Sequence, residues 1–203
     1  MEKTELCFLA EKWKTDKCKA LFHNYTPYYY DLLKDRKETT TSVLELGIGF
    51  PECMWHVSHL GYQKGASLYM WRDFFPNSKI YGIDIKTEAM FEDDRIQTYL
   101  SGQTDYLTLE KVLGDKQFDL ILDDASHQPQ DQKDSFFFLQ KYLKPDGIYI
   151  IEDLIDGLWP SSKVEELFEM AKMEYGFKIA KEYDIRKDSN YRVTDDRFLF
   201  FQK

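Results

Sequence analysis

From Ser42 onward, short apolar runs alternate with segments of helical spacing. The strand-like runs are SVLELGIG, KIYGIDI, RIQTYLSG, FDLILDD and PDGIYIIEDL, and helices are expected at 66–75, 130–143 and 161–173. This alternation predicts βαβ units and a largely parallel sheet covered on both faces. The last two apolar segments, GFKIAKEYDI and YRVTDDRFLFFQ, have only a short connection between them. We therefore expect them to form an antiparallel closing pair.

The first 36 residues are mostly helical in pattern, with a break at the sequence HNYTP. Pro27 suits the first turn of a new helix, with Thr26 as its N-cap. For the helix at 161–173, Ser161 or Ser162 is the expected N-cap. No repeat, low-complexity tract or linker interrupts the sequence. The expectation is one domain over 1–203, with a helical segment at 1–36 and an α/β core at 42–203.

Composition narrows the class of protein. The 203 residues are 43% hydrophobic and 16% aromatic, which suits one packed domain. A net charge of -9 argues against a general grip on nucleic-acid phosphates. No apolar stretch approaches the roughly 20 residues that span a bilayer, and the opening MEKTELCFLAEKWK lacks the features of a signal peptide. Three cysteines, an odd and sparse number, favour a reducing, cytoplasmic compartment.

Candidate binding residues stand where the predicted strands end, because ligands of open α/β sheets bind outside the carboxyl ends of the strands. The first strand ends in LELGIG, whose Gly47 and Gly49 allow a sharp turn and a close approach to a ligand. A dinucleotide fingerprint requires a third glycine and an immediate helix, and FPE follows instead. Taken alone, the two glycines are equally consistent with a simple tight turn.

The next two strand ends carry polar side chains. Asp84 ends the second strand, where an acidic residue commonly accepts hydrogen bonds from ribose hydroxyls. The third strand ends in SGQTD, whose small and amide residues suit an adenine edge. The alternative at both places is helix capping, by Asp84 itself or by Thr104 or Asp105.

Four motifs, taken in their order along the chain, resemble the successive cofactor motifs of class I S-adenosylmethionine-dependent methyltransferases. They are LELGIG, YGIDI, SGQTD and FDLILDD. The resemblance covers nearly the whole chain. It implies an α/β, Rossmann-like, seven-stranded and mostly parallel sheet, with an antiparallel last strand and helices on both faces. It also implies S-adenosylmethionine as cofactor. The cofactor-binding candidates in these motifs are Glu45, Gly47, Gly49, Asp84, Gln103, Asp105 and, on the cofactor side of the fourth strand, Asp123. Ser67 opens a helix, and its N-terminus would favour the methionine carboxylate.

A narrower resemblance lies in KWKTDKCKALFHNYTPYYYDLL, GASLYMWRDFFPNSKIYGIDI, DDASH and YIIEDL. These stretches are similar to the metal-dependent sugar O-methyltransferases typified by the mycinamicin and macrocin enzymes of macrolide biosynthesis. That family opens with Gly-Thr-Asp-Lys, and here Lys14 replaces the glycine; Ala125 replaces the glycine of its DDGSH motif. The resemblance implies that Thr15 and Lys17, with Asp16 and His23, belong to a segment that closes over the cofactor.

Methyl transfer to a sugar hydroxyl requires alignment of three atoms and activation of a weakly acidic oxygen. A cation and a base both help. Asp124 follows the fourth strand, and Glu152 and Asp153 end the fifth. Since neighbouring strands lie about 4.8 Å apart, these carboxylates can converge on one Mg²⁺, with Mn²⁺ as the alternative. His127 is the predicted general base, because histidine is largely neutral at pH 7. The family resemblance implies the same four residues.

Structural alternatives exist for each of these residues. Aspartates after a strand are often turn residues, and an exposed histidine usually has no function. Two adjacent acidic strand ends nevertheless repel each other unless a positive charge lies between them. Consecutive side chains of a strand point to opposite faces, so Asp123 and Asp124 are not both expected at the metal. We assign Asp124 to the metal and Asp123 to the cofactor side.

The connection at 50–64 is long enough to predict a lid or a binding loop. Its Trp55, His56 and Tyr62 suit stacking on a sugar ring or exclusion of water, and packing over the cofactor is the alternative. A zinc site of Cys53, His56 and His59 is disfavoured, because it offers three ligands in an unusual spacing.

The sequence therefore predicts an O-methyltransferase that uses S-adenosylmethionine and Mg²⁺ on a sugar or glycoside acceptor. The favoured acceptor is a deoxyhexose such as rhamnose, on a glycan or a glycosylated natural product. The alternatives are a catechol-type methyltransferase, a non-catalytic binding module and, disfavoured by the missing third glycine, a nicotinamide-dependent oxidoreductase. The chain is short for the family, so a homo-oligomer or a fusion to a glycosyltransferase module is also envisaged.

Overall fold

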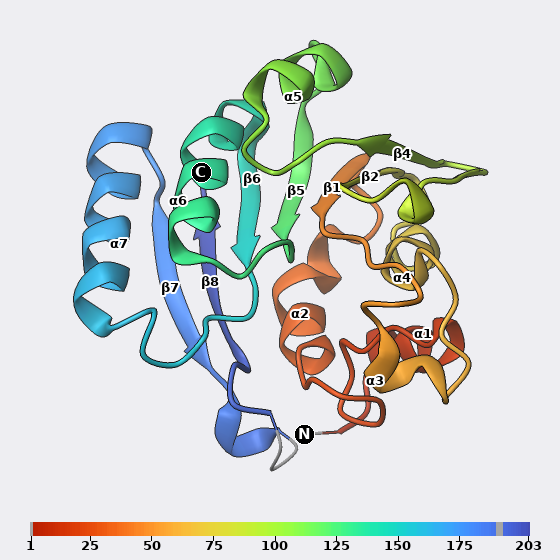
Figure 1. Cartoon of the computed structure of the whole chain (residues 1–203). Helices are drawn as coiled ribbons and strands as arrows, with labels where there is room; N and C mark the ends of the chain where they lie inside the picture. Colours follow the sequence, from red (N-terminus) through yellow and green to blue (C-terminus); the bar gives the residue numbers. More distant parts are fainter. Residues whose placement is uncertain (1, 190–192) are drawn as a thin grey trace.

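One sheet runs through the computed structural model, which describes residues 2–189 and 193–203 (Figure 1). Among the described residues it has eight strands, in the order β3-β4-β2-β1-β5-β6-β8-β7. The strands are β1 Ser42–Leu46, β2 Lys79–Asp84, β3 Glu92–Asp93, β4 Ile96–Leu100, β5 Phe118–Asp123, β6 Leu143–Ile151, β7 Ile179–Asp184 and β8 Arg197–Gln202. Tyr191 and Arg192, at the start of the last predicted strand segment, lie outside the described residues.

The predicted strand directions are confirmed. Strands β4, β2, β1, β5 and β6 run parallel, and β8 lies antiparallel to both β6 and β7. The predicted count of seven strands is wrong, because the two-residue β3 adds an antiparallel edge to β4. Arg95 makes this turn possible: it adopts a left-handed conformation (φ 59°), and its guanidinium donates to the carbonyls of Arg72, Phe75 and Ser78.

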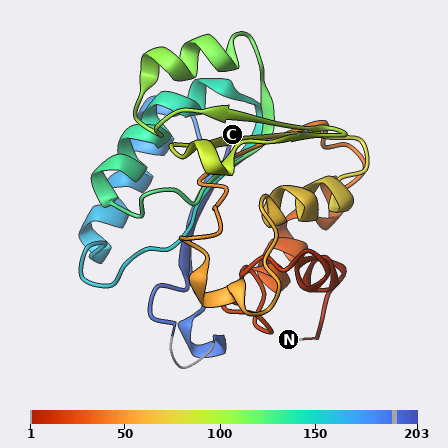
Figure 2. The ribbon, with the colours of Figure 1, turned by 45° about the vertical axis from the view of Figure 1, so that its right-hand side comes forward.

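Helices cover both faces of the sheet, as expected (Figures 1 and 2). They are α1 Glu5–Trp13, α2 Thr26–Leu33, α3 Trp55–Ser58, α4 Ala66–Phe74, α5 Tyr106–Leu113, α6 Pro129–Leu139 and α7 Ser161–Tyr175. Short 3-10 turns lie at Lys34–Arg36, Thr87–Ala89, Gln140–Tyr142 and Arg186–Asp188. No helix within 2–189 and 193–203 is long and apolar enough to cross a membrane.

The alternation of side chains along the strands divides the core into two layers. On β5, Leu120 and Leu122 pack in the layer with Tyr29 of α2 and Trp71 of α4. Ile121, between them in sequence, packs in the opposite layer, which includes Leu109, Phe136 and Leu167 from α5, α6 and α7. Because the sheet is buried on both faces, its functional groups are displayed at the strand ends.

Several predicted helix boundaries are wrong. Tyr25, not Thr26, is the N-cap of α2, and the Thr26 hydroxyl donates to Cys7 Sγ inside the fold. Pro160 is the N-cap of α7 without a side-chain hydrogen bond, so neither Ser161 nor Ser162 caps it. The helix predicted at 130–143 ends at Leu139, because a 3-10 turn leads directly into β6.

The strand register brings the carboxyl ends of β1, β5 and β6 to one level. Leu46 pairs with Asp123, which pairs with Ile151 on its other side. Gly47 (φ 76°) packs so closely on the neighbouring strand end that a Cβ atom there would lie 2.1 Å from the carbonyl oxygen of Asp124. Only glycine permits this contact, which fixes the first turn against the residues that follow β5.

Candidate active site

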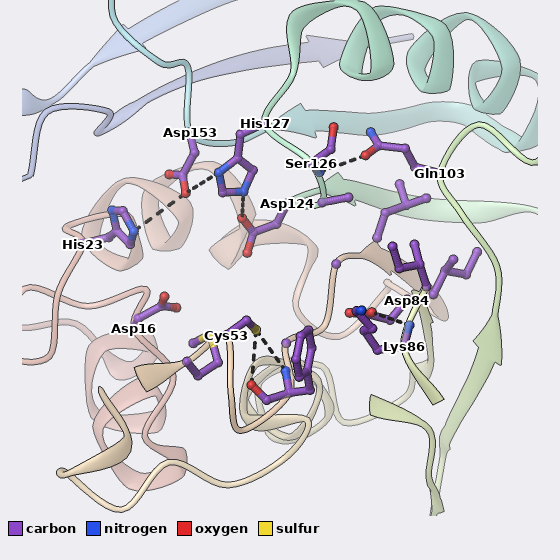
Figure 3. Close-up of a pocket in the computed structure, with 18 of the residues that line it drawn as sticks. Asp16, His23, Cys53, Asp84, Lys86, Gln103, Asp124, Ser126, His127 and Asp153 are labelled. Atoms are coloured by element: carbon purple, nitrogen blue, oxygen red, sulfur yellow. Dashed lines mark hydrogen bonds and ion pairs between the residues drawn. The ribbon is translucent and has the colours of Figure 1, made fainter. Parts of the chain in front are cut away.

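A cavity of about 440 Å³ lies at the carboxyl ends of the strands (Figure 3). Predicted site residues on its walls are Gly47, Gly49, Asp84, Gln103, Asp124, His127 and Asp153. The opposite wall comes from the N-terminal segment and from the connection at 50–64, with Asp16, His23, Cys53 and His56 among its residues. The cavity therefore joins candidates that are dispersed over most of the sequence.

One end of the cavity carries polar groups around Asp84. Its Oδ2 accepts from the Ile48 N–H at 3.2 Å, and its Oδ1 accepts from the Lys86 N–H at 2.9 Å (Figure 3). Gln103 is held in a similar way, since its Oε1 accepts from the Ser126 N–H at 2.8 Å. These bonds fix a carboxylate and an amide in a recessed position, which suits the hydroxyls and base edge of a nucleoside.

The other end holds Asp124, His127 and Asp153, each of which offers one ligand atom within 4.8 Å of the others. His127 lies between the two carboxylates, with Nε2 3.2 Å from Asp124 Oδ1 and Nδ1 3.6 Å from Asp153 Oδ2 (Figure 3). A second histidine, His23, approaches Asp153 Oδ2 to 3.8 Å through its Nε2 and is fixed at Nδ1 by the buried Asp196. This end is the acidic end of the cavity.

The backbone of this cluster is strained. His127 (φ 56°) and Asp153 (φ 53°) both adopt the left-handed conformation that non-glycine residues rarely occupy. Such a residue costs about 1–3 kcal/mol and persists only where its surroundings fix it. The hydroxyl of Tyr25 donates to Asp153 Oδ1 and supplies one such constraint. Strain at two facing residues is typical of a functional site.

A buried ammonium group lies beneath the acidic end. Lys17 Nζ is 2.6 Å from Asp124 Oδ2, 2.5 Å from Glu152 Oε2 and 3.6 Å from Glu45 Oε1. Burial opposes the charge of Lys17, but the three carboxylates outweigh it and hold the pKa well above its usual value. Lys17 was predicted at the cofactor; the structure places it between the strand ends as a fixed positive charge.

Two of the three predicted metal ligands face each other, and the third is turned aside. Both oxygens of Glu152 are engaged, Oε2 by Lys17 and Oε1 by the hydroxyl of Tyr29 at 2.7 Å. Among the described residues, Glu152 is not part of the Asp124–His127–Asp153 cluster. Alternation at the end of β6 explains the difference, because adjacent side chains point in opposite directions.

The same alternation separates Asp123 from Asp124. Asp123 is fully buried and accepts hydrogen bonds from the Ser135 hydroxyl, the Ala125 N–H and the amide of Gln103. It does not line the cavity, so it reaches the predicted cofactor side only through Gln103. The expectation that Asp123 and Asp124 have different surroundings is met.

Two carboxylates beside His127 favour its charged form. Burial lowers the pKa of His127, but the hydrogen bond that His127 donates to Asp124 and the charge of Asp153 outweigh burial and raise it to about 10. For Asp124, burial acts to raise the pKa, and Lys17 and His127 reverse this and hold it well below its usual value.

The remaining cofactor candidates lie near the cavity or outside it. Thr15 and Ser67 are buried beside a small recess next to the main cavity. Glu45 is fully buried behind it, where burial, opposed by Lys17, raises the pKa to about 7. Asp105 lies outside both hollows and caps α5, with its side chain accepting from the Thr108 N–H.

The connection at 50–64 contacts the N-terminal segment on one wall of the cavity. His56 Nε2 lies 3.0 Å from Asp16 Oδ2, and both residues line the cavity. Trp55 does not line it and is 74% exposed, whereas Tyr62 faces the recess. Among the described residues, Cys53, His56 and His59 are not part of a cluster of possible metal ligands.

Comparison with known proteins places this geometry in context. No family model matches the sequence. The chain is 33% identical over 163 residues to mycinamicin VI 2''-O-methyltransferase of Micromonospora griseorubida, covering 78% of the chain and 38% of the relative. It is 35% identical over 157 residues to 8-demethyl-8-(2-methoxy-alpha-L-rhamnosyl)-tetracenomycin-C 3'-O-methyltransferase of Streptomyces olivaceus, covering 75% of the chain and 37% of the relative.

Comparison of the fold with solved structures points to the same group of proteins. The MycE methyltransferase in complex with Mg, SAH and mycinamycin VI matches with a TM-score of 0.78 and 26% identity, over 100% of this chain and 55% of that one. The chain is a homologue of macrolide sugar O-methyltransferases. It has the class I S-adenosylmethionine-dependent methyltransferase fold, so the resemblance carried by its motifs is confirmed. The chain spans about two fifths of the length of the curated relatives it matches.

Proposed function

We propose that the protein transfers a methyl group from S-adenosylmethionine to a sugar hydroxyl, with Mg²⁺ or Mn²⁺ at the acidic end of the cavity. The favoured acceptor is a deoxyhexose such as rhamnose, on a glycan or a glycosylated natural product. One observation carries the proposal: a single cavity has a nucleoside-like end at Asp84 and Gln103 and the Asp124–His127–Asp153 cluster at the other. The names of the relatives, which include methyltransferases of rhamnosyl compounds, support the choice of acceptor.

The residues present fit a hard divalent cation. Asp124 and Asp153 offer carboxylate oxygens toward the same space, and Glu152 is adjacent as the third candidate ligand. No cysteine sulfur is part of this cluster, and oxygen ligands favour Mg²⁺ over softer metals. When bound, the cation would stabilise the negative charge that develops on the acceptor oxygen.

His127 is the proposed general base, with Nε2 as the atom that takes the hydroxyl proton. The two carboxylates that raise its pKa to about 10 are also the proposed cation ligands. Compensation of their negative charge would lower the pKa of His127 and favour the neutral imidazole that a base requires. The strained backbone at His127 and Asp153 keeps these groups oriented toward each other.

At the nucleoside-like end, Asp84 is positioned to accept from the ribose hydroxyls. Gln103 and the buried Ser101 supply polar contacts for a base edge. The turn at Gly47 and Gly49 lets the cofactor lie against the backbone, between this end and the acidic end. This order would direct the methyl group toward His127.

A methylation assay tests the proposal. The purified protein is incubated with S-adenosylmethionine, Mg²⁺ and a panel of rhamnosides, other glycosides and catechols, and methyl gain is followed by mass spectrometry. We expect transfer to glycosides, and we expect EDTA to abolish it while binding of S-adenosylhomocysteine persists in calorimetry. EDTA already saturated with Mg²⁺ is the control. Methylation of catechols alone would contradict the proposed acceptor, and full activity in free EDTA would contradict the cation.

The assembly of the protein also stays a prediction. A homo-oligomer, a fusion to a glycosyltransferase module and a cytoplasmic location are proposed from the sequence, and light scattering of the purified protein measures the first directly.

A further inference from the structure

A small recess adjoins the main cavity between the first strand turn, the N-terminal segment and the start of α4. Its volume is about 20 Å³, which is room for one small polar group. It shares Asp16, Gly47, Gly49, Met54 and Asp124 with the main cavity, so a ligand in the cavity can extend one end into it.

The hydroxyl of Tyr62 faces this recess. The oxygen is buried beside the Gly65 N–H, and among the described residues no acceptor takes the hydroxyl proton. Gly49 (φ +72°) makes room for it, since a Cβ atom at that position would lie 2.8 Å from the Tyr62 oxygen. An unpaired buried hydroxyl is destabilising. This cost is recovered if a ligand group accepts the hydrogen bond.

The charges around the recess indicate which group this is. Ser67, near the N-terminus of the nine-residue helix α4, lines the recess together with Lys17, whose ammonium is already paired with Asp124, Glu152 and Glu45. Free N–H groups at a helix N-terminus favour an anion. The carboxylates of Asp16 and Asp124 also line the recess, and carboxylates favour a cation. A ligand end with both a carboxylate and an ammonium group matches this arrangement.

We propose that Tyr62 donates a hydrogen bond to the amino-acid end of S-adenosylmethionine. This inference rests on the proposed function, and it gives the connection at 50–64 a different task from stacking on a sugar ring. Through Tyr62 the connection binds the cofactor, and through His56 it contacts Asp16 of the N-terminal segment. Tyr62 is then a binding residue specific for the part of the cofactor that carries the charges.

Two ligands distinguish this role from simple packing. S-Adenosylhomocysteine carries the amino-acid end, whereas 5′-methylthioadenosine has the same nucleoside without it. Tyr62→Phe removes one oxygen and keeps the ring. We expect it to raise the Kd of S-adenosylhomocysteine about tenfold in calorimetry, the effect of losing a hydrogen bond to a charged group, and to leave the Kd of 5′-methylthioadenosine unchanged.

Tyr99→Phe is the matched control, because Tyr99 lies on β4 and lines neither hollow. It should alter neither Kd. Equal weakening of both ligands by Tyr62→Phe would overturn the inference in favour of a packing role, and so would unchanged binding of S-adenosylhomocysteine. Failure of the unaltered protein to bind S-adenosylhomocysteine would overturn the proposed function together with the inference.

Discussion

The ends of β5 and β6 carry two adjacent carboxylates each, and the two pairs divide in the same way. At the end of β5, Asp123 is buried away from the cavity and Asp124 lines it. At the end of β6, Glu152 is turned aside and Asp153 lines the cavity. The second acid of each pair approaches His127. Each strand end thus supplies one buried and one accessible carboxylate.

The two buried acids differ in how their charge is accommodated. Glu152 accepts from the ammonium of Lys17 and from Tyr29. Asp123 accepts only from neutral groups, the Ser135 hydroxyl, the Ala125 N–H and Gln103 among them. Burial raises the pKa of Asp123 to about 7, against the effect of these hydrogen bonds. Burial also raises the pKa of Glu152 well above its usual value, with Lys17 opposing that shift, so the two buried acids differ in their partners and not in the direction of their pKa.

The largest expected effect is a loss of stability when Glu152, the buried acid at the end of β6, loses its ammonium partner. Lys17→Met removes the ammonium and leaves Glu152 and Asp124 without their buried partner. Breaking a buried ion pair on one side costs about 3–5 kcal/mol, so the free energy of unfolding should fall by about that amount. Urea unfolding followed by circular dichroism measures it.

Two further variants test the interpretation. Adding Glu152→Gln to Lys17→Met should restore part of the lost stability, because one of the unpaired charges is then absent. Lys3→Met removes an exposed lysine that is paired with Glu11 and should leave stability unchanged. A single Lys17→Met variant as stable as the unaltered protein would remove the distinction between the two strand ends.

The next largest effect is expected on turnover, at His127, which lies between the cavity-facing carboxylates of the two strand ends. His127→Ala should lower kcat about a hundredfold, the usual contribution of a general base, with little change in acceptor KM. Binding of S-adenosylhomocysteine should persist, because His127 belongs to the cluster with Asp124 and Asp153 and not to the polar groups around Asp84. Steady-state kinetics with the best glycoside measures both constants.

His59→Ala is the control for this variant, since His59 is exposed on the connection at 50–64 and lines no cavity. Its kcat should match that of the unaltered protein. If His127→Ala retained full turnover, the two cavity-facing acids would have no shared catalytic partner.

Much of the fold was predictable because the sequence alternates between two periodicities. The order of strands and helices, the parallel direction and the antiparallel closing pair all follow from that alternation. The eighth strand, β3, was not predictable, because two residues carry no periodic pattern and their pairing depends on distant contacts of Arg95. Helix ends were mispredicted where tertiary contacts overrode capping preferences, as at Thr26.

The candidate site was predictable in its members and less so in its arrangement. Alternation along a strand correctly separated Asp123 from Asp124, and the same rule applied to Glu152 and Asp153 would have separated them as well. Lys17 was not predictable as their counter-ion, because it lies 135 residues from Glu152 in the sequence. Tyr25 and Tyr29 are buried in the core, and their hydroxyls also hold Asp153 and Glu152.

The smallest effect is expected at the buried acid of β5. Asp123→Asn keeps the shape of the side chain and replaces a group that is already about half neutral at pH 7. At pH 4, where folded Asp123 is protonated, the free energy of unfolding should change by less than about 1 kcal/mol, because the partners of Asp123 are neutral and hydrogen-bond to either form. Urea unfolding at pH 4 measures this.

The pH dependence should change in a defined direction. The pKa of Asp123 rises from 3.8 in its usual state to about 7 in the folded protein, so between these values the folded state keeps a proton that the unfolded state has lost. Stability from this group is therefore present at low pH and is lost as pH rises through 7. Asp123→Asn should flatten that decline in unfolding measurements between pH 4 and 8. If plots of unfolding free energy against pH stayed parallel for the two proteins, Asp123 would be ionised throughout this range. The two strand ends would then accommodate their buried charges in the same way.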